Sequence, residues 1–222
     1  MLGKVKQKSN NALPYLFMAL FALSRWPGLF PPSFSAAYAV VFCAGVYFTK
    51  RINQWFLLGT MLFTDIALNF YYQNVKGWDV WTLSNLAHQG VVYFCWIMLF
   101  VLGRRFKPGS SFVSLLGGGI LGALLFYLIT NTASWLFNPF DNPEYHKNLA
   151  GLLIAIVKGT GGWPDAWMFF RNTLLSGGLF TSLFVAAMKI TAASESPQDK
   201  EAGVRAGEPE ENPETAPEEA KA

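Results

Sequence analysis

Polar side chains recur at helical spacing inside otherwise apolar stretches of this sequence. Asp65, Asn69 and Tyr72 follow one another at intervals of four and three residues, which places them on one face of a helix. Arg171 and Asn172 lie together within another apolar stretch. A carboxylate in apolar surroundings must find a cation or take up a proton. The residue types therefore predict a buried ion pair or a binding site for a polar solute.

The same spacing recurs in two further stretches. Their polar or amphipathic members are Asn85, His88, Gln89 and Trp96 in one stretch and Tyr127, Thr130, Asn131, Ser134 and Asn138 in the other. Arg25 comes near the end of the first apolar stretch, so Arg25 or Arg171 is the expected partner of Asp65. The candidate substrate-binding residues are Arg171, Asn172, Asp65, Asn131, Thr130, Gln89, His88, Asn69 and Arg25.

Three interpretations of these polar residues are open. They form a packing network that fixes helix register, they form a ligand site, or the arginines reach the membrane boundary with their charged heads. A catalytic or metal site is not expected, because His88 and His146 have no partner at catalytic or metal-ligand spacing. Cys43 and Cys95 lie in apolar stretches and are expected to be buried hydrophobes. We expect no metal and no cofactor.

The composition indicates a membrane protein. The 222 residues are 52% hydrophobic and 14% charged, whereas a soluble domain carries about 25% charged residues. A helix needs about 20 mostly apolar residues to cross a bilayer. The stretches that qualify are 12–29, 34–49, 54–73, 85–103, 112–137 and 166–190. We therefore expect an all-α integral membrane protein with six transmembrane helices.

Two apolar stretches differ from ordinary membrane spans. The apolar run at 148–158 is too short to cross and predicts a short interfacial or re-entrant helix between the fifth and sixth spans. The first stretch has an alternative interpretation as a secretory signal, because Lys4, Lys6 and Lys8 precede it. Removing it would spoil the alternation of charge described next.

Basic residues alternate between the two sets of connections. Nine lie at one set and three at the other, so the positive-inside rule predicts an inner (cytoplasmic) membrane protein with both termini in the cytoplasm. Most of the candidate residues then fall in the outer half of the bilayer, which predicts a polar cavity open to the outside. Six tryptophans near the outer boundary fit an interfacial belt or ring stacking in a pocket. They are Trp26, Trp78, Trp81, Trp135, Trp163 and Trp167.

The chain divides into three parts by composition. We expect a basic cytoplasmic N-terminus at 1–11, the six-span membrane domain at 12–190 and an acidic tail at 191–222. The tail holds nine acidic and three basic residues, a net charge of −6, while residues 1–190 carry +9. With no aromatic residue and many prolines and glutamates, the tail is expected to be disordered.

Three segments carry a resemblance to a known group of proteins. They are RWPGLFPPSFSAAYAVVFCAGVYFTKR, FYLITNTASWLF and FFRNTLLSGGLFTSLF. They resemble segments of an uncharacterised group of bacterial six-span membrane proteins to which a transport role is ascribed. That group in turn resembles the S components of energy-coupling-factor (ECF) transporters. The resemblance covers most of residues 15–188, but Ser33 replaces an asparagine and Gly178 stands where the group has an aspartate.

The resemblance implies an S-component-like bundle whose ligand pocket lies near the outer face and is partly covered by the loop after the first span. It implies uptake of a small molecule through a membrane-embedded substrate-binding component. Energising transporter subunits would be separate proteins, since this chain has no Walker sequence. The expected partners are the lipid bilayer, a small polar or anionic ligand and such subunits, but not nucleic acid. The alternative is a non-transport structural or assembly protein of the cell envelope.

Overall fold

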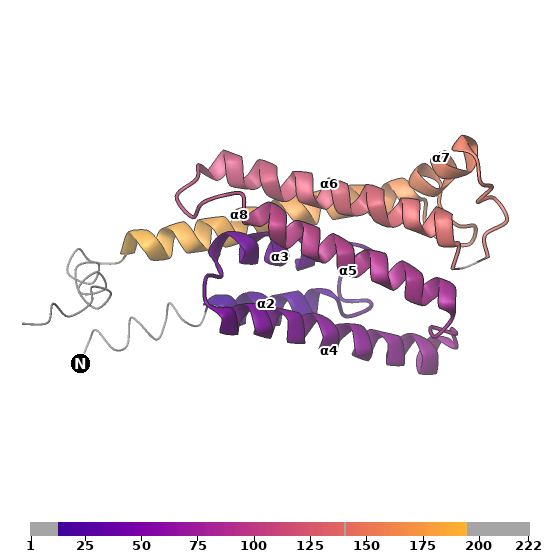
Figure 1. Cartoon of the computed structure of the whole chain (residues 1–222), viewed down its shortest axis with the longest axis horizontal. Coiled ribbons are helices and arrows are strands. Elements are labelled where there is room, and N and C mark those ends of the chain that lie inside the picture. The colour runs from indigo at the N-terminus through magenta and orange to yellow at the C-terminus, as the bar shows by residue number, and fades with distance from the viewer. Residues whose placement is uncertain (1–12, 140, 195–222) are drawn as a thin grey trace, which may run out of the picture.

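All the regular secondary structure in the described part of the chain is helical. The computed structural model describes residues 13–139 and 141–194, and these contain no strand. Their helices are α2 (Leu13–Ser24), α3 (Ala37–Tyr47), α4 (Arg51–Lys76), α5 (Leu83–Gly103), α6 (Phe112–Phe137), α7 (Leu149–Val157) and α8 (Ala166–Ser194). Apart from the short α7, they run roughly along one common axis (Figure 1). The all-α prediction is confirmed.

Three of these helices are long and apolar enough to cross a membrane, namely α5, α6 and α8. This supports association with a membrane, but the prediction of six crossing helices is not supported. The first two predicted spans are helical for only 12 residues in α2 and 11 in α3, against the roughly 20 that a crossing needs. The hydrophobic runs were misleading there because Pro27, Pro31 and Pro32 interrupt the helical backbone.

Helix α4 also falls outside that set, for a different reason. It has 26 residues, but its apolar side chains alternate with several polar ones. Its buried residues are Leu57, Met61, Thr64 and Asp65, which share one face. Large apolar side chains such as Phe63 cover the exposed faces. Helix α4 is therefore a peripheral helix that packs against the bundle chiefly through α2.

The short helix α3 is the centre of the bundle. Nine of its 11 residues are buried, and it packs against α2, α5, α6 and α8. A helix that is apolar on all sides is expected to be buried on all sides. Gly45 in α3 and Gly103 at the end of α5 allow the two backbones to approach closely, since a Cβ on either glycine would overlap the other helix. The core therefore depends on a half-length helix enclosed by longer ones.

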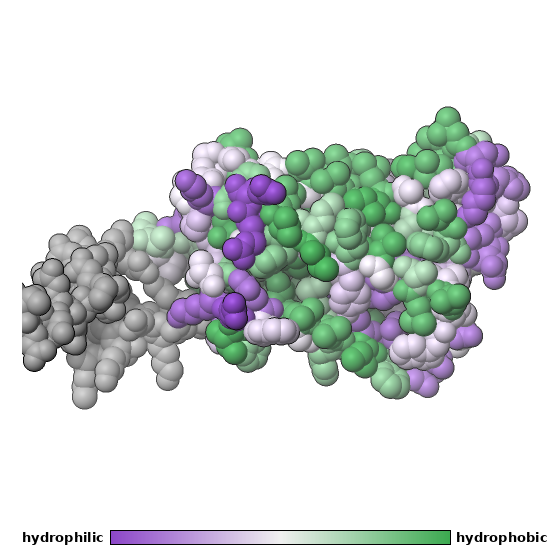
Figure 2. All heavy atoms as spheres, in the orientation of Figure 1, coloured by the Kyte–Doolittle hydropathy of each residue, from purple (hydrophilic) through white to green (hydrophobic). Residues whose placement is uncertain are grey.

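Hydrophilic side chains gather at the two ends of the bundle (Figure 2). We call one the basic end, which carries Lys50, Arg51, Arg104, Arg105 and Lys107. The C-terminal part of α8 reaches this end, where Lys189 Nζ donates to the Ser110 carbonyl at 2.8 Å. We call the other the distal end, formed by the α4–α5, α6–α7 and α7–α8 connections. Most of the visible surface between them is hydrophobic (Figure 2).

Two boundaries can be compared with the predicted domains. The short helix predicted at 148–158 is present as α7, which packs against α6 and α8. Helix α8 continues to Ser194, beyond the predicted end of the membrane domain at residue 190. The predicted N-terminal segment 1–11 and the rest of the predicted tail lie outside the described residues.

The α3–α5 crossing gives a first prediction. In Gly103→Ala the new Cβ would overlap the Phe42 carbonyl oxygen, so the helices must separate at a cost of about 1–3 kcal/mol. We expect a lower apparent Tm for the purified protein in detergent. The control is Gly90→Ala, also on α5, where a Cβ meets nothing within 4 Å and alanine favours the helix by about 1 kcal/mol. Equal melting temperatures for the two variants would contradict the close crossing.

Candidate functional site

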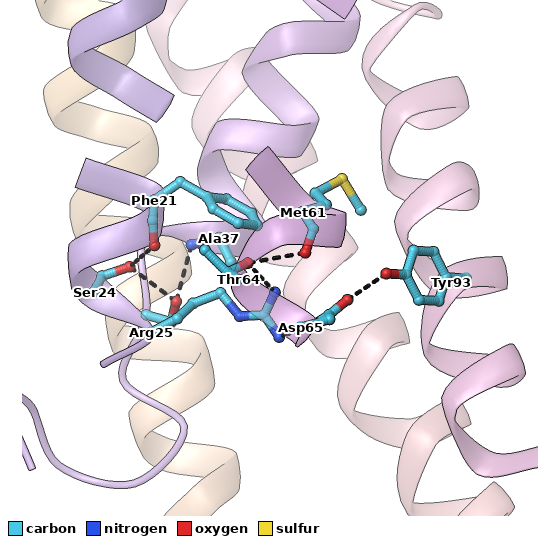
Figure 3. Close-up of polar contacts among 9 residues, drawn as sticks. Phe21, Ser24, Arg25, Ala37, Met61, Thr64, Asp65 and Tyr93 are labelled. Carbon is cyan, nitrogen blue, oxygen red and sulfur yellow. Dashed lines mark hydrogen bonds and ion pairs between the residues drawn. The ribbon is translucent and has the colours of Figure 1, made fainter. Parts of the chain in front are cut away.

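An ion pair joins α2 to the middle of α4. Arg25 directly follows α2 and forms a salt bridge with Asp65, and their side chains are 15% and 8% exposed. The second guanidinium nitrogen donates to Thr64 Oγ1 at 2.9 Å. Figure 3 shows the guanidinium lying between the two helices. Of the two cations that the sequence offered as partners of Asp65, the structure selects Arg25.

A phenol completes the surroundings of the carboxylate. Tyr93 Oη on α5 donates to the second Asp65 oxygen at 2.5 Å (Figure 3). Asp65 is 14 residues into α4, about 21 Å along its axis at 1.5 Å per residue, and Tyr93 is the central residue of α5. The charge pair thus lies at mid-height in the bundle. Because α4 packs mainly on α2, this hydrogen bond is an important direct link from α4 to α5.

Two serines terminate the helices on either side of this ion pair. Ser24 Oγ donates to the Phe21 carbonyl at 3.0 Å and accepts from the Ala36 N–H at 2.9 Å. Ser35 Oγ accepts from the Ala37 N–H at 3.1 Å, so the N–H groups of Ala36 and Ala37, where α3 begins, are satisfied inside the protein. Both helices therefore end beside the ion pair, deep in the bundle.

Residues 25–36, which we call the α2–α3 connection, are also tied to α8. Asn172 Nδ2 donates to the Pro32 carbonyl at 2.9 Å. Phe34 packs against Phe180, with ring centroids 5.9 Å apart. The connection is thus attached to α4 at its first residue and to α8 at its centre.

A separate polar contact joins α5 to α6. His88 Nε2 and Ser134 Oγ share a hydrogen bond of 3.1 Å. Thr130 and Asn131 instead turn back onto their own helix, where they donate to the Phe126 and Tyr127 carbonyls at 2.8 Å. These three predicted site residues lie at the α5–α6 contact, and within the described residues none of them is hydrogen-bonded to Arg25 or Asp65. Sequence periodicity grouped residues by helix face, whereas the structure separates them into distinct clusters.

Two predicted residues retain unused hydrogen-bonding groups. Asn69 on α4 and Gln89 on α5 are half-buried, and neither side chain has a hydrogen-bond partner within residues 13–139 and 141–194. Asn69 is one turn beyond Asp65 toward the distal end, and Gln89 is one turn from Tyr93 on the same side. They are the polar groups nearest in sequence to the ion pair that could bind a solute without breaking a contact of the fold.

Arg171, the other candidate partner of Asp65, does not meet that carboxylate. It is exposed, and within the described residues it has no acidic partner. It belongs to an exposed stripe that repeats every fourth residue along α8, made up of Trp167, Arg171, Leu175, Leu179 and Leu183. Its guanidinium carbon lies 5.4 Å from the centre of the Trp167 ring. Arg171 therefore lies outside the Asp65 cluster and on the outer surface of the helix.

A row of aromatic rings lies beyond the ion pair toward the distal end. Successive ring centroids are 6.2 Å apart for Trp26 and Tyr71, 5.4 Å for Tyr71 and Tyr72, 4.8 Å for Tyr72 and Trp78, and 5.4 Å for Trp78 and Trp163. The row links the α2–α3 connection, α4, the α4–α5 connection and the α7–α8 connection. Three of the six tryptophans that predicted a belt or a stacking site are thus in one continuous chain of contacts.

Sequence reasoning missed the contribution of Tyr93. A signal was present, because Gln89, Tyr93 and Trp96 follow at intervals of four and three residues on the same stretch. Ser24 and Ser35 were also missed, since their contacts with the backbone can be recognised only when the helix ends are known. Within the described residues, no group of three or more His, Cys, Asp or Glu side chains is placed to hold a metal.

A groove of about 300 Å³ lies elsewhere on the molecule. It is lined by Arg51, Gln54, Trp55 and Leu58 at the start of α4, at the basic end and away from the polar clusters. Gln54 already donates to the Phe48 carbonyl at 2.8 Å. This groove does not coincide with any predicted site residue.

A family model matches residues 5–199, which is most of the chain. The chain belongs to a family of unknown function, DUF6580. No curated protein and no solved structure matches it. Membership of DUF6580 agrees with the uncharacterised status of the group that the sequence resembles, but it carries no link to transport or to ECF components. Those expectations remain predictions for this DUF6580 member.

The ion pair gives a second prediction. Asp65→Ala leaves the largely buried Arg25 without its carboxylate, which we expect to destabilise the protein by about 3–5 kcal/mol. The double variant Arg25→Met, Asp65→Leu removes both charges and is expected to be more stable than Asp65→Ala alone. The free energies of unfolding of both variants, measured in the same detergent, test this expectation. A double variant no more stable than Asp65→Ala would show that the two charges are not energetically coupled.

Proposed function

We propose that this DUF6580 protein is a membrane-embedded substrate-binding component for uptake of a small polar or anionic molecule. The solute site would lie on the distal side of the Arg25–Asp65 pair, toward the outside of the cell. One observation carries the proposal: the α2–α3 connection turns back at mid-height in the bundle, beside an ion pair.

A bilayer restricts where the chain can be non-helical. Helices α2 and α3 are 12 and 11 residues long, about 18 and 17 Å, compared with about 30 Å of hydrocarbon. The connection between them would therefore lie at membrane depth. Irregular backbone there is tolerated only where protein buries it or where it lines a water-filled cavity. Seven of the 12 residues at 25–36 are exposed, which favours water.

Interrupted helices beside a charged pair are the arrangement that many transporters use for their sites. An ionisable residue inside a membrane indicates function by default, because it is expensive to keep there. Asn69 and Gln89 would supply free amide groups to the solute, and Arg25 would contribute guanidinium donors not used by Asp65 and Thr64. In this proposal Asn131, Thr130 and His88 shape the α5–α6 wall, and Asn172 holds the α2–α3 connection.

The wider architecture follows from the same proposal. Six helical elements would traverse or enter the membrane in an S-component-like bundle, with α2 and α3 as its two short members. The basic end would face the cytoplasm, since it carries six of the eleven Lys and Arg residues in the described part of the chain. Both termini would then lie on the cytoplasmic side of the inner membrane. Transport would require separate energising subunits or movement of these helices.

A structural or assembly protein of the envelope is the second candidate. It is favoured by the pairing of several half-buried and buried polar groups within the chain itself, as in Arg25 with Asp65, His88 with Ser134 and Asn172 with Pro32. Such contacts fix helix positions without any solute.

Cysteine labelling tests whether water reaches the α2–α3 connection. Leu29→Cys and Leu183→Cys replace leucines that are 55% and 53% exposed, one on the connection and one on the apolar stripe of α8. A membrane-impermeant maleimide added to intact cells should label the Leu29→Cys variant and leave the Leu183→Cys variant unlabelled. The native Cys43 and Cys95 are buried and should not contribute. Failure to label at position 29, with normal expression, would contradict a water-filled site open to the outside.

Native mass spectrometry tests the bound solute. The purified protein should carry a reproducible small-molecule adduct, and Gln89→Ala should reduce its occupancy by about threefold to tenfold through loss of one hydrogen bond. The matched control is Gln73→Ala, an exposed residue of α4 that is expected to leave the adduct unchanged. A well-folded protein without any adduct, both as purified and after exposure to a metabolite extract, would favour the structural alternative.

A further inference from the structure

We propose that the exposed stripe of α8 is a binding site for a phospholipid. The Arg171 guanidinium would bind the phosphodiester, and an acyl chain would lie along Leu175, Leu179 and Leu183. This inference depends on α8 crossing a membrane and is independent of any solute site.

The position of Arg171 along α8 fits the level of the lipid phosphates. Arg171 and Lys189 are 18 residues apart, about 27 Å at 1.5 Å per residue, and the hydrocarbon layer is about 30 Å thick. Lys189 is held at the basic end by the Ser110 carbonyl. The two cations therefore bracket the hydrocarbon layer, and Arg171 lies at its distal boundary.

The charge of Arg171 is available to an anion. Neither salt bridge found within the described residues involves it, unlike Arg25, which Asp65 neutralises. The Trp167 ring lies 5.4 Å from its guanidinium carbon, and Asn172 Oδ1 accepts a hydrogen bond from it at 3.5 Å. These two neighbours restrict the guanidinium while leaving most of its donors free. A guanidinium in a defined position can bind a phosphate through two parallel hydrogen bonds.

The leucines that follow Arg171 on α8 could contact the acyl chain of the same lipid. They are exposed and recur every fourth residue on the basic-end side of Arg171. Leu183 is 12 residues from Arg171, about 18 Å, which is close to the roughly 15 Å of hydrocarbon in one leaflet. A phosphate bound at Arg171 would thus place its acyl chains alongside this stripe. We propose a lipid and not free phosphate, because only a lipid would bind both the Arg171 guanidinium and the leucines that follow it.

The site also touches the α2–α3 connection. The Asn172 side chain accepts from Arg171 with its oxygen and donates to Pro32 with its nitrogen. A bound lipid that fixes Arg171 would therefore help to fix this amide and the connection with it.

Delipidated protein titrated with long-chain phosphatidylglycerol and followed by native mass spectrometry tests the site. Arg171→Ala should weaken the tightest lipid adduct by about tenfold or more. Arg171→Lys should lose less, because lysine keeps the charge without the planar fork. The control Lys158→Ala removes an exposed cation of the distal end whose charge Glu144 already neutralises, and it should bind as the wild type does.

Two further measurements distinguish a phospholipid from free phosphate as the bound molecule. Excess inorganic phosphate should not displace the lipid, and a short-chain phosphatidylglycerol should bind more weakly than the long-chain form. The proposal is overturned if Arg171→Ala, with an unchanged melting temperature, binds long-chain lipid as tightly as Lys158→Ala does. Displacement by inorganic phosphate would also overturn it, in favour of a simple anion site.

Discussion

The pairing of Arg25 with Asp65 is the interaction on which the arrangement of this molecule depends. It lies at the point where α2 stops, and it holds the middle of α4, which otherwise packs mainly on α2. Tyr93 extends the contact to α5. A carboxylate at mid-height in an apolar bundle requires such compensation, since an unpaired charge there would cost several kcal/mol (order of magnitude). The pair therefore determines which helices can lie next to each other.

A second constraint follows from the prolines of the α2–α3 connection. Proline has no N–H to donate, so Pro27, Pro31 and Pro32 reduce the number of backbone donors that need partners in a segment without helical bonds. The adjoining serines accept from the N–H groups of Ala36 and Ala37, where α3 begins. These features make it possible for the chain to turn back inside the bundle and leave α3 as a short central helix.

The two arginines show how one residue type takes opposite positions. Arg25 is largely buried and compensated by a carboxylate, while Arg171 is exposed on α8 and has no acidic partner within the described residues. The long arginine side chain can bury its stem and keep its charge in a polar layer. Position relative to the helix ends and the presence of an acid therefore decide which behaviour each arginine shows.

The sequence alone determined that the described chain is helical, that it associates with a membrane and that Asp65 needs a cation, because composition and a 3.6-residue period carry those properties. It also predicted the short helix now seen as α7. Only the tertiary structure decided that Arg25 and not Arg171 meets Asp65, that Tyr93 joins them, and that α3 is a short central helix. A helical period specifies which residues share a face, but the neighbour of that face depends on how helices far apart in sequence pack together.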